Sequence, residues 1–364
     1  MILGLMLLGM MPLAHAAAVR GTMVLGPGPS QWDSAQVFRP WVIFDGTSFK
    51  MWYVGEDSNQ ADRIGMATSN DGMSWTKYSG NPVLDLGTAG GWDGDSISDA
   101  CVIFENGQYK MWYTGQQYGA TSADDVYEIG YATSSDGIHW TKYASNPVLT
   151  PGSLGSWDDK RVWRPSVIST GSSYVMYYRG AALEGQAKAG VATSSDGMHW
   201  TKTTVLTMPP GSSGWDAYSR QVGALNIGGV MKSGDTYIMS YSSIKAQQGT
   251  PAEIGVASSP DGTNWTPYPD NPVVTYGSSG WDGGPGGVGA GTFAGSMILA
   301  AHDQYYVYYA AQSAEGQQPY DIGFVTLAMS QYPIPEYSST TLVAVVAVLA
   351  SIGLLRLRAK RPQE

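Results

Sequence analysis

Three charged residues occupy the same place in a repeated pattern, and their types limit the chemistry open to them. Asp99 lies seven positions after the tryptophan of a Trp-Asp pair, and the same spacing after two other such pairs gives Arg39 and Arg164. An arginine stays protonated at any working pH, so it cannot be a general acid. Two guanidinium groups beside Asp99 would favour its ionised form. Asp99 could therefore be a base, a nucleophile or a ligand-binding anion, but not the proton donor.

The Trp-Asp pairs mark a sequence repeat. They begin at Trp32, Trp92, Trp157, Trp215 and Trp281, so successive pairs are 58 to 66 residues apart. Self-similarity at this scale indicates an array of equivalent supersecondary units. The first unit contains PWVIFDG, SFKMWYVG, RIGMATSNDG and SWTKYSGNPVL, each a β-rich run bounded by turn residues. We expect an all-β fold, a five-bladed β-propeller of four-stranded antiparallel blades over residues 17–333.

The fifth unit lacks a clear fourth strand. Its runs SMILAAHD, QYYVYYAAQ and YDIGFVTLAM account for three strands. We expect the N-terminal segment AVRGTMVLG to supply the fourth strand and so close the ring.

A second motif, Ser-x-Asp-Gly-x-x-Trp, joins the third and fourth strands in four of the units. Its carboxylates are Asp71, Asp136, Asp196 and Asp261. Asp-Gly between two β runs predicts a hairpin, because Gly supplies a positive φ and Asp can accept hydrogen bonds from nearby backbone N–H groups. A carboxylate repeated in four blades is expected to be structural rather than catalytic.

In a propeller the third strands start on the same face as the first strands. Glu128 begins a third strand in the same blade as Asp99, beside the long loop QQYGATSADDVY. It is the best candidate for a general acid near Asp99. The alternative is an ordinary solvated charge at a strand end, since exposed Glu is common.

Composition excludes some partners and cofactors. The chain carries a formal net charge of −10, which argues against binding to nucleic acid or anionic lipid. Cys101 is the only cysteine, so no internal disulfide is possible, and its strand context suggests a buried small hydrophobe. The four histidines have no metal-ligand spacing, and no phosphate-cradling loop is evident. We expect neither a metal nor a cofactor, and the sequence leaves the oligomeric state open.

The two ends differ in kind from the repeats. Residues 1–16 form an apolar run that ends in Ala-His-Ala, typical of a cleaved secretory signal peptide. Residues 334–364 contain TLVAVVAVLASIGLL followed by RLRAKR, an apolar run with a basic flank that predicts a membrane anchor. Together with the preceding YPIPEY, this tail resembles the sorting signals of PEP-CTERM and PEF-CTERM proteins. We expect an exported protein at the cell surface, held to the membrane through its C-terminal tail.

The repeats resemble the five-bladed glycoside hydrolases of families 43, 32, 62 and 130. The resemblance rests on YKMWYTG, IGYATSSDGIHW and NPVLTPGSLGSWD, and it runs from about Trp32 to Tyr332. It implies catalytic acids near the start of the inner strands of the first three blades, typically Asp, Asp and Glu. Arg39 and Arg164 replace two of these three, and only Asp99 remains.

This departure weakens the case for hydrolysis and strengthens the case for carbohydrate binding. The usual mechanism needs two carboxyl groups, one of them able to donate a proton. Binding needs less, and Arg39, Arg161, Trp163 and Arg164 offer planar donors and an aromatic face that suit a sugar. The arginines could equally form a structural bridge with Asp99 between the blades.

Three functions follow from these features. The first is a surface protein that binds carbohydrate on a glycosidase-like scaffold, with residual hydrolase activity at most. The second is an active glycoside hydrolase that uses Asp99 and a displaced acid such as Glu128. The third is a structural or adhesive surface protein without a small ligand.

Overall fold

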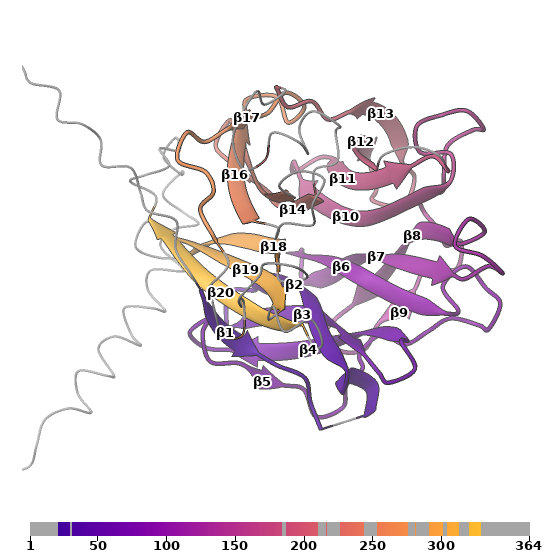
Figure 1. Ribbon diagram of the computed structural model, residues 1–364, viewed down its shortest axis with the longest axis horizontal. Helices are drawn as coiled ribbons and strands as arrows, with labels where there is room; N and C mark the ends of the chain where they lie inside the picture. Colours follow the sequence, from indigo (N-terminus) through magenta and orange to yellow (C-terminus); the bar gives the residue numbers. More distant parts are fainter. Residues whose placement is uncertain are drawn as a thin grey trace, which may run out of the picture.

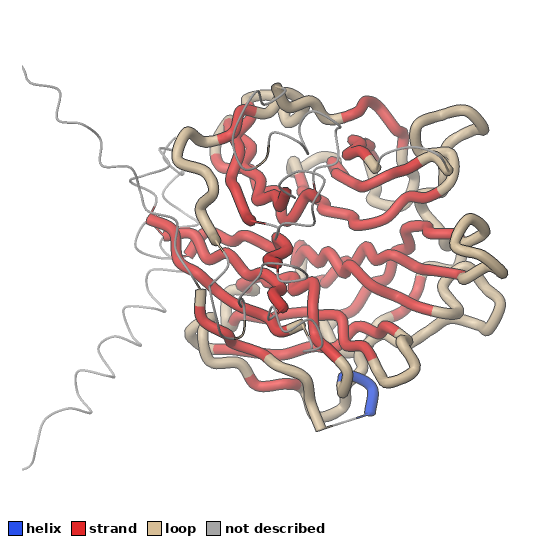
Figure 2. The backbone as a smooth tube through the Cα atoms, in the orientation of Figure 1, coloured by secondary structure: helices blue, strands red, loops and turns tan. Residues whose placement is uncertain are grey.

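The computed structural model is an all-β protein, which confirms the expected fold class. It describes residues 21–29, 31–183, 187–209, 216, 226–243, 253–275, 281, 291–300, 304–312 and 320–328. Strands dominate this part of the chain, and the single helix within it is the short 3-10 turn η1 (Gln31–Asp33) (Figure 2).

The strands form antiparallel sheets that follow the order of the chain. One sheet comprises β2 (Gln36–Phe44), β3 (Phe49–Glu56), β4 (Asp62–Ser69) and β5 (Thr76–Lys77). The next comprises β6 (Ser96–Glu105), β7 (Gln108–Gln117), β8 (Val126–Ser134) and β9 (Thr141–Lys142). It is followed by β10 (Arg161–Ser169), β11 (Tyr174–Ala181), β12 (Lys188–Ser194) and β13 (Thr201–Val205). Then come β14 (Asn226–Ser233), β15 (Thr236–Ser243), β16 (Glu253–Ser259) and β17 (Thr266–Pro267).

The last sheet joins the two ends of the described chain. It consists of β18 (Gly291–Ala300), β19 (Gln304–Gln312), β20 (Asp321–Ala328) and β1 (Thr22–Leu25). β1 pairs antiparallel with β20, with Thr22 opposite Phe324. This pairing confirms that the N-terminal segment supplies the strand missing from the last repeat.

The first strands of the sheets lie side by side around the middle of the molecule. β2 contacts β6, β6 contacts β10, β10 contacts β14, β14 contacts β18, and β18 contacts β2 again. In Figure 1 these strands are central, while β5, β9, β13 and β17 lie at the periphery. The second and third sheets are also joined by one parallel pair, Arg161 opposite Tyr127, so their strands form a continuous eight-stranded sheet.

Hydrogen bonds link the neighbouring sheets near their first strands. Between the first and second sheets, Trp41 Nε1 donates to the Val102 carbonyl at 2.8 Å, and between the second and third, Val167 N donates to Cys101 Sγ at 3.1 Å. Between the third and fourth, Val230 N donates to Ser166 Oγ at 3.0 Å. The last sheet is linked to the fourth by Ser240 Oγ, which donates to the Gly295 carbonyl at 3.1 Å, and to the first by Val42 N, which donates to Ser296 Oγ at 2.9 Å. These bonds pair polar groups that would otherwise be buried without partners.

The core lies between adjacent sheets rather than within any one of them. In one cluster Trp52 and Ile64 of the first sheet pack against Val102 and Met111 of the second. Each sheet therefore buries both of its faces against neighbours, which accounts for strands that are apolar along most of their length. Cys101 is part of this core, as expected, and is fully buried.

The Asp-Gly turns are structural, as their repetition predicts. In the second sheet Asp136 Oδ1 accepts hydrogen bonds from Ile138 N and His139 N, both at 2.8 Å. Gly137 has a φ of 79°, and its carbonyl accepts a hydrogen bond from Trp52 Nε1 of the preceding sheet at 3.0 Å. The turn thus fixes both its own hairpin and the contact with the neighbouring sheet.

The aspartates of the Trp-Asp pairs are structural too. Asp93 is buried, and it accepts hydrogen bonds from Tyr113 Oη at 3.1 Å and Lys142 Nζ at 2.8 Å. Asp33 and Asp158 make the equivalent contacts in the first and third sheets. These three pairs therefore tie the start of their repeats to the second and fourth strands.

The predicted signal peptide (residues 1–16) and C-terminal tail (residues 334–364) lie outside the described residues. So does Trp215, the expected start of the fourth repeat. Within the described part of the chain, no helix has the length and apolarity needed to cross a bilayer.

Candidate functional site

A backbone irregularity recurs in the first strand of each sheet, and it carries the three charged residues of the repeat. The pairing of β2 with β3 shifts between Phe38 and Trp41. The same shift occurs between Ser98 and Cys101 in β6, and between Trp163 and Ser166 in β10. Such a β-bulge turns the side chain of the extra residue out of the regular alternation.

Arg39, Asp99 and Arg164 are the first residues of these bulges. Their φ angles are 52°, 52° and 56°, in the left-handed region that residues with a Cβ rarely adopt. A non-glycine residue in this region costs of order 1–3 kcal/mol, and such residues cluster at functional sites. The resemblance implies positions near the start of the inner strands, and the three residues lie three positions after the first residues of β2, β6 and β10.

The first strands of the last two sheets, β14 and β18, have glycines at the equivalent bulge positions. The register of β14 shifts between Ile227 and Val230, and that of β18 between Ala294 and Met297. Gly228 and Gly295 are the first bulged residues there, so these two bulges contribute no side chain to the cavity.

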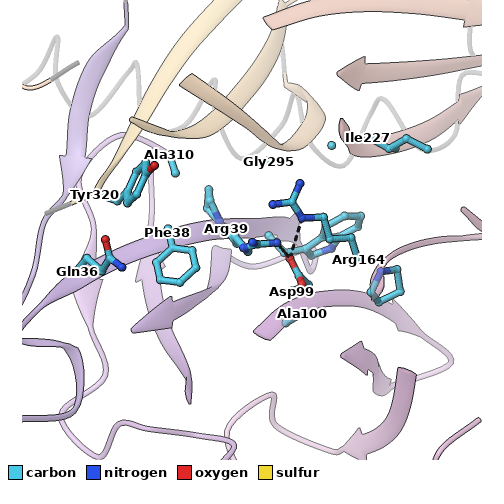
Figure 3. A pocket seen from close by; sticks show the side chains of 14 residues that line it. Gln36, Phe38, Arg39, Asp99, Ala100, Arg164, Ile227, Gly295, Ala310 and Tyr320 are labelled. Atoms are coloured by element: carbon cyan, nitrogen blue, oxygen red, sulfur yellow. Dashed lines mark hydrogen bonds and ion pairs between the residues drawn. The ribbon is translucent and has the colours of Figure 1, made fainter. Parts of the chain in front are cut away.

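The bulges surround a cavity of about 170 Å³. It is lined by Gln36, Phe38, Arg39, Pro40, Trp41, Asp99, Ala100, Arg164, Pro165, Ile227, Gly228, Gly295, Ala310 and Tyr320. Figure 3 shows Arg39 and Arg164 on either side of Asp99, with Phe38 and Tyr320 beyond Arg39. The structure thus brings together three of the six predicted site residues, from the three first strands β2, β6 and β10.

Asp99 is held as an anion by the two arginines. Its Oδ1 accepts a hydrogen bond from Arg39 Nη1 and lies 3.6 Å from Arg164 Nε, while Ser98 Oγ donates to Oδ2 at 3.1 Å. Burial by itself would raise the pKa of Asp99, but the positive charges of Arg39 and Arg164 outweigh it and the pKa lies below its ordinary value. Asp99 is therefore ionised and unsuited to proton donation.

Arg164 is fixed from both sides of its bulge. Its backbone N–H donates to Thr114 Oγ1 at 3.0 Å, and its Nη1 donates to Asn226 Oδ1 at 2.8 Å. Burial, and then repulsion from Arg39, lower the pKa of Arg164 well below its ordinary value, against the attraction of Asp99. The guanidinium is thus held rigidly in a position that is electrostatically costly.

Phe38 and Tyr320 give the cavity an aromatic wall. Their ring centroids are 6.2 Å apart, and the Arg39 guanidinium carbon lies 5.6 Å from the Phe38 ring centroid. An aromatic face next to planar charged donors suits a ligand with one apolar face and several polar substituents.

Arg161 and Trp163 do not line the cavity. Arg161 Nη2 donates to the Ser122 carbonyl, the guanidinium lies 4.9 Å from the Tyr127 ring centroid, and Nη2 is 3.6 Å from Asp125 Oδ2. Arg161 is therefore engaged with the loop between β7 and β8. Trp163 packs edge-on against Tyr127 at 6.1 Å between ring centroids.

Glu128 does not line the cavity either. It is half-buried on β8, opposite Gly115 of β7, and burial raises the pKa of its carboxyl. No interaction with Asp99 or with the arginines contributes to this shift. The predicted role of Glu128 as a general acid stays a prediction.

Arg179 is a charged neighbour that the sequence analysis missed. It lies opposite Trp163 in the pairing of β10 with β11, and its guanidinium carbon is 5.3 Å from the Trp163 ring centroid. Burial, and then repulsion from Arg39, lower the pKa of Arg179 to about 10, against the attraction of Asp99. The motif MYYRG shows an arginine in an otherwise apolar strand, which is the signal that could have revealed it.

Asp62 is a second missed residue. It is buried at the start of β4, opposite Glu56, and its Oδ1 has no hydrogen-bond partner. Burial, and then the charge of Glu56, raise the pKa of Asp62 to about 7, while Arg39 opposes and Asp99 adds to the rise. Asp62 and Asp99 are thus within electrostatic reach of each other, with pKa values shifted in opposite directions.

The described residues contain no cluster of three or more His, Cys, Asp or Glu side chains that could hold a metal ion. His139 and His199 belong to Asp-Gly turns, where Nδ1 of each lies 2.7 Å from an aspartate of its own turn.

Comparisons with known proteins agree on the fold of this chain and say less about its function. Residues 92–215 match the model of the glycosyl hydrolases family 32 N-terminal domain. Two uncharacterised Mycobacterium tuberculosis proteins, MT1551 and Rv1502, are each 32% identical over 203 residues, which cover 53% of this chain and 64% of theirs. The chain therefore matches less than two thirds of the length of these relatives.

Solved structures share the fold at low sequence identity. A glycosyl hydrolase from Bacteroides ovatus has a TM-score of 0.63 and 18% identity, over 88% of this chain and 96% of that one. A structure from a study of β-1,2-mannosidic glycoside hydrolases in the GH130 family of mannoside phosphorylases has a TM-score of 0.62 and 18% identity, over 89% and 98%. The N-acetylgalactosamine deacetylase from Flavonifractor plautii, bound to blood group B trisaccharide, has a TM-score of 0.61 and 14% identity, over 86% and 96%. The chain has a glycoside hydrolase-like fold, and its relatives include proteins that act on glycans.

Proposed function

We propose that the cavity between the first strands binds a carbohydrate. The observation that carries the proposal is the convergence of Arg39, Asp99 and Arg164 on one cavity with an aromatic wall, each from a different repeat and each in a left-handed bulge. Guanidinium and carboxylate groups match sugar hydroxyls as donors and acceptors, and an aromatic ring matches the apolar face of a pyranose. Relatives that act on glycans add support.

Binding fits the cavity better than hydrolysis by the usual mechanism. Hydrolysis requires a second carboxyl group that can donate a proton. Among the described residues that line the cavity, Asp99 is the only acidic one, and its two arginine neighbours keep it ionised. Arg39 and Arg164 cannot replace a proton donor.

Asp62 is the observation that favours hydrolysis as a second candidate function. A carboxyl with a pKa near 7 and a nearby ionised carboxylate are the pair that acid catalysis needs. Asp62 does not line the cavity, so the reacting bond would have to lie between β4 and β6. Turnover of chromogenic glycosides by the full chain, abolished by Asp62→Asn, is the result that this candidate predicts.

The proposal extends to architecture and location. The cyclic contacts of the first strands and the closing pair β1–β20 support a propeller of five blades. The apolar N-terminal run and the apolar, basic-flanked C-terminal run support export and anchoring at the cell surface through residues 334–364.

A glycan array probed with the full chain tests carbohydrate binding. We expect the wild type to bind a defined subset of glycans and Arg164→Gln to lose about tenfold or more in affinity, the scale of a lost charge-assisted hydrogen bond. Arg63→Gln is the matched control, because Arg63 pairs with Asp57 and Asp85 away from the cavity. Equal binding by Arg164→Gln and wild type, or binding to no glycan, would reject the proposal.

A further inference from the structure

The site contains more positive than negative charge. Arg39, Arg164 and Arg179 lie within electrostatic reach of one another, and Asp99 is the anion that all three share. Asp62 also acts on this group through Arg39, but its raised pKa of about 7 leaves its carboxyl only partly ionised at neutral pH. Among the described residues, the three guanidinium groups are therefore balanced by the full negative charge of Asp99 and the partial negative charge of Asp62.

Several of the donors of these arginines are unused. A guanidinium has five N–H donors, and in a buried position each unpaired donor is destabilising. The Nε atoms of Arg164 and Arg179 are buried without a hydrogen-bond partner. Arg164 makes one side-chain hydrogen bond, to Asn226, and its contact with Asp99 is longer than a hydrogen bond.

The like charges are held together by the fold. The bulges of β2 and β10 fix Arg39 and Arg164, and the pairing of β10 with β11 fixes Arg179 behind Trp163. Burial, and then repulsion from Arg39, lower the pKa of both Arg164 and Arg179. A structural bridge would need only one arginine for one aspartate, so the additional cations require another explanation. A ligand that carries a negative charge would relieve the repulsion and accept the free N–H groups.

The cavity has room for such a ligand next to these donors. Gly228 and Gly295 line the cavity without a Cβ of their own, and Phe38 and Tyr320 form an aromatic wall beside Arg39 (Figure 3). A pyranose ring against this wall would bring a substituent of the ring to Arg39 and Arg164.

We propose that the ligand is an acidic glycan, and that the carboxylate of a uronic acid residue binds at Arg164 and Arg39, with Arg179 adding positive charge from behind. This inference rests on the proposed carbohydrate binding and specifies the class of sugar. A planar carboxylate matches the paired N–H groups of a guanidinium better than a neutral hydroxyl does.

Matched acidic and neutral oligosaccharides test the inference. The probes are oligosaccharides of galacturonic and glucuronic acid and the same oligosaccharides as methyl esters, with affinities measured by calorimetry on the full chain. We expect the esters to bind about tenfold or more weakly, as for the loss of a charge-assisted hydrogen bond. Binding of the acids, but not of the esters, should weaken with increasing ionic strength.

Variants of Arg179 separate its charge from its packing. Arg179→Gln should weaken binding of the acids and leave the esters unchanged, while Arg179→Lys should keep most of the affinity for the acids because the charge is retained. Arg63→Gln should alter neither affinity, because its ion pairs lie outside the site.

The other outcomes distinguish this inference from the function on which it rests. Equal affinity for acids and esters, or binding of neutral glycans alone, would overturn the acidic specificity and leave carbohydrate binding intact. Inorganic phosphate that binds as tightly as the acidic sugars would show a site for a free oxyanion and would overturn the assignment to a glycan carboxylate. Binding of none of these probes and of no glycan on the array would overturn both.

Discussion

The pH dependence of stability offers a direct test of the burial of Asp62. The residue is 9% exposed, and its Oδ1 has no hydrogen-bond partner. Burial, and then Glu56, raise its pKa from 3.8 to about 7. Asp62→Asn keeps the shape of the side chain and removes its titration.

The sign of the effect follows from proton binding. Between about pH 4 and about pH 7 the folded protein keeps a proton on Asp62 that the unfolded chain has released. The contribution of Asp62 to the free energy of unfolding therefore decreases as the pH rises through this window, and it is lowest above the folded pKa. The pKa difference of about 3 units corresponds to about 4 kcal/mol, at about 1.4 kcal/mol per unit.

Urea unfolding near pH 5 and near pH 8 measures this contribution. We expect the free energy of unfolding of Asp62→Asn, relative to wild type, to rise by about 2 to 3 kcal/mol between the two pH values. Asp321, whose pKa burial raises to about 6, titrates in the same direction. It is present in both proteins, so its effect cancels in the difference.

Asp261→Asn is the control for a general effect of removing a carboxylate, because its turn contains no histidine. Hydrogen bonds from Asn264 and from the Thr263 N–H lower the pKa of Asp261, so it titrates below this pH window. Its difference from wild type should be the same at both pH values. If Asp62→Asn also differs from wild type by a constant amount, Asp62 does not carry a raised pKa and its proposed capacity to donate a proton is lost.

Three further results are expected. Asp136→Ala should lower the free energy of unfolding by about 1 kcal/mol through the loss of turn hydrogen bonds, with unchanged glycan binding; weaker binding at normal stability would contradict a purely structural role. Burial raises the pKa of Cys101, so iodoacetamide should label it only as fast as the protein unfolds, and rapid labelling of the native protein would argue against the core position. Asp99→Asn leaves Arg39 and Arg164 without their shared counter-charge and should cost about 3 kcal/mol of stability together with glycan binding. Lost stability with full binding would instead assign Asp99 to a structural bridge.

The sequence could predict the repeating scaffold because the signals for it are local. Asp136 and Gly137 form their turn from a side chain and backbone groups within a few residues, so the motif is sufficient to predict the hairpin. The alternation of β-rich runs with turns predicted the strands in the same way. The strand that closes the last sheet could also be predicted, because three strands in a unit of four leave one unpaired edge.

The candidate site could be predicted only in part. Equal spacing from the Trp-Asp pairs singled out Arg39, Asp99 and Arg164, and the cavity contains all three. Spacing alone did not reveal the bulges that aim them inward, although Pro40 and Pro165 were a usable signal, since proline inside a strand indicates a bulge or an edge.

The strands, their turns and the residue types at each repeat follow from the amino-acid sequence, because they depend on contacts a few residues long. The packing of the sheets, in contrast, engages Arg161 with the loop after β7, brings Arg179 within reach of Asp99, and buries Asp62 near Arg39. These features escape prediction because electrostatic interactions and burial depend on distances between sheets. Those distances are set by how neighbouring sheets pack around the ring, and no local pattern in the chain encodes them.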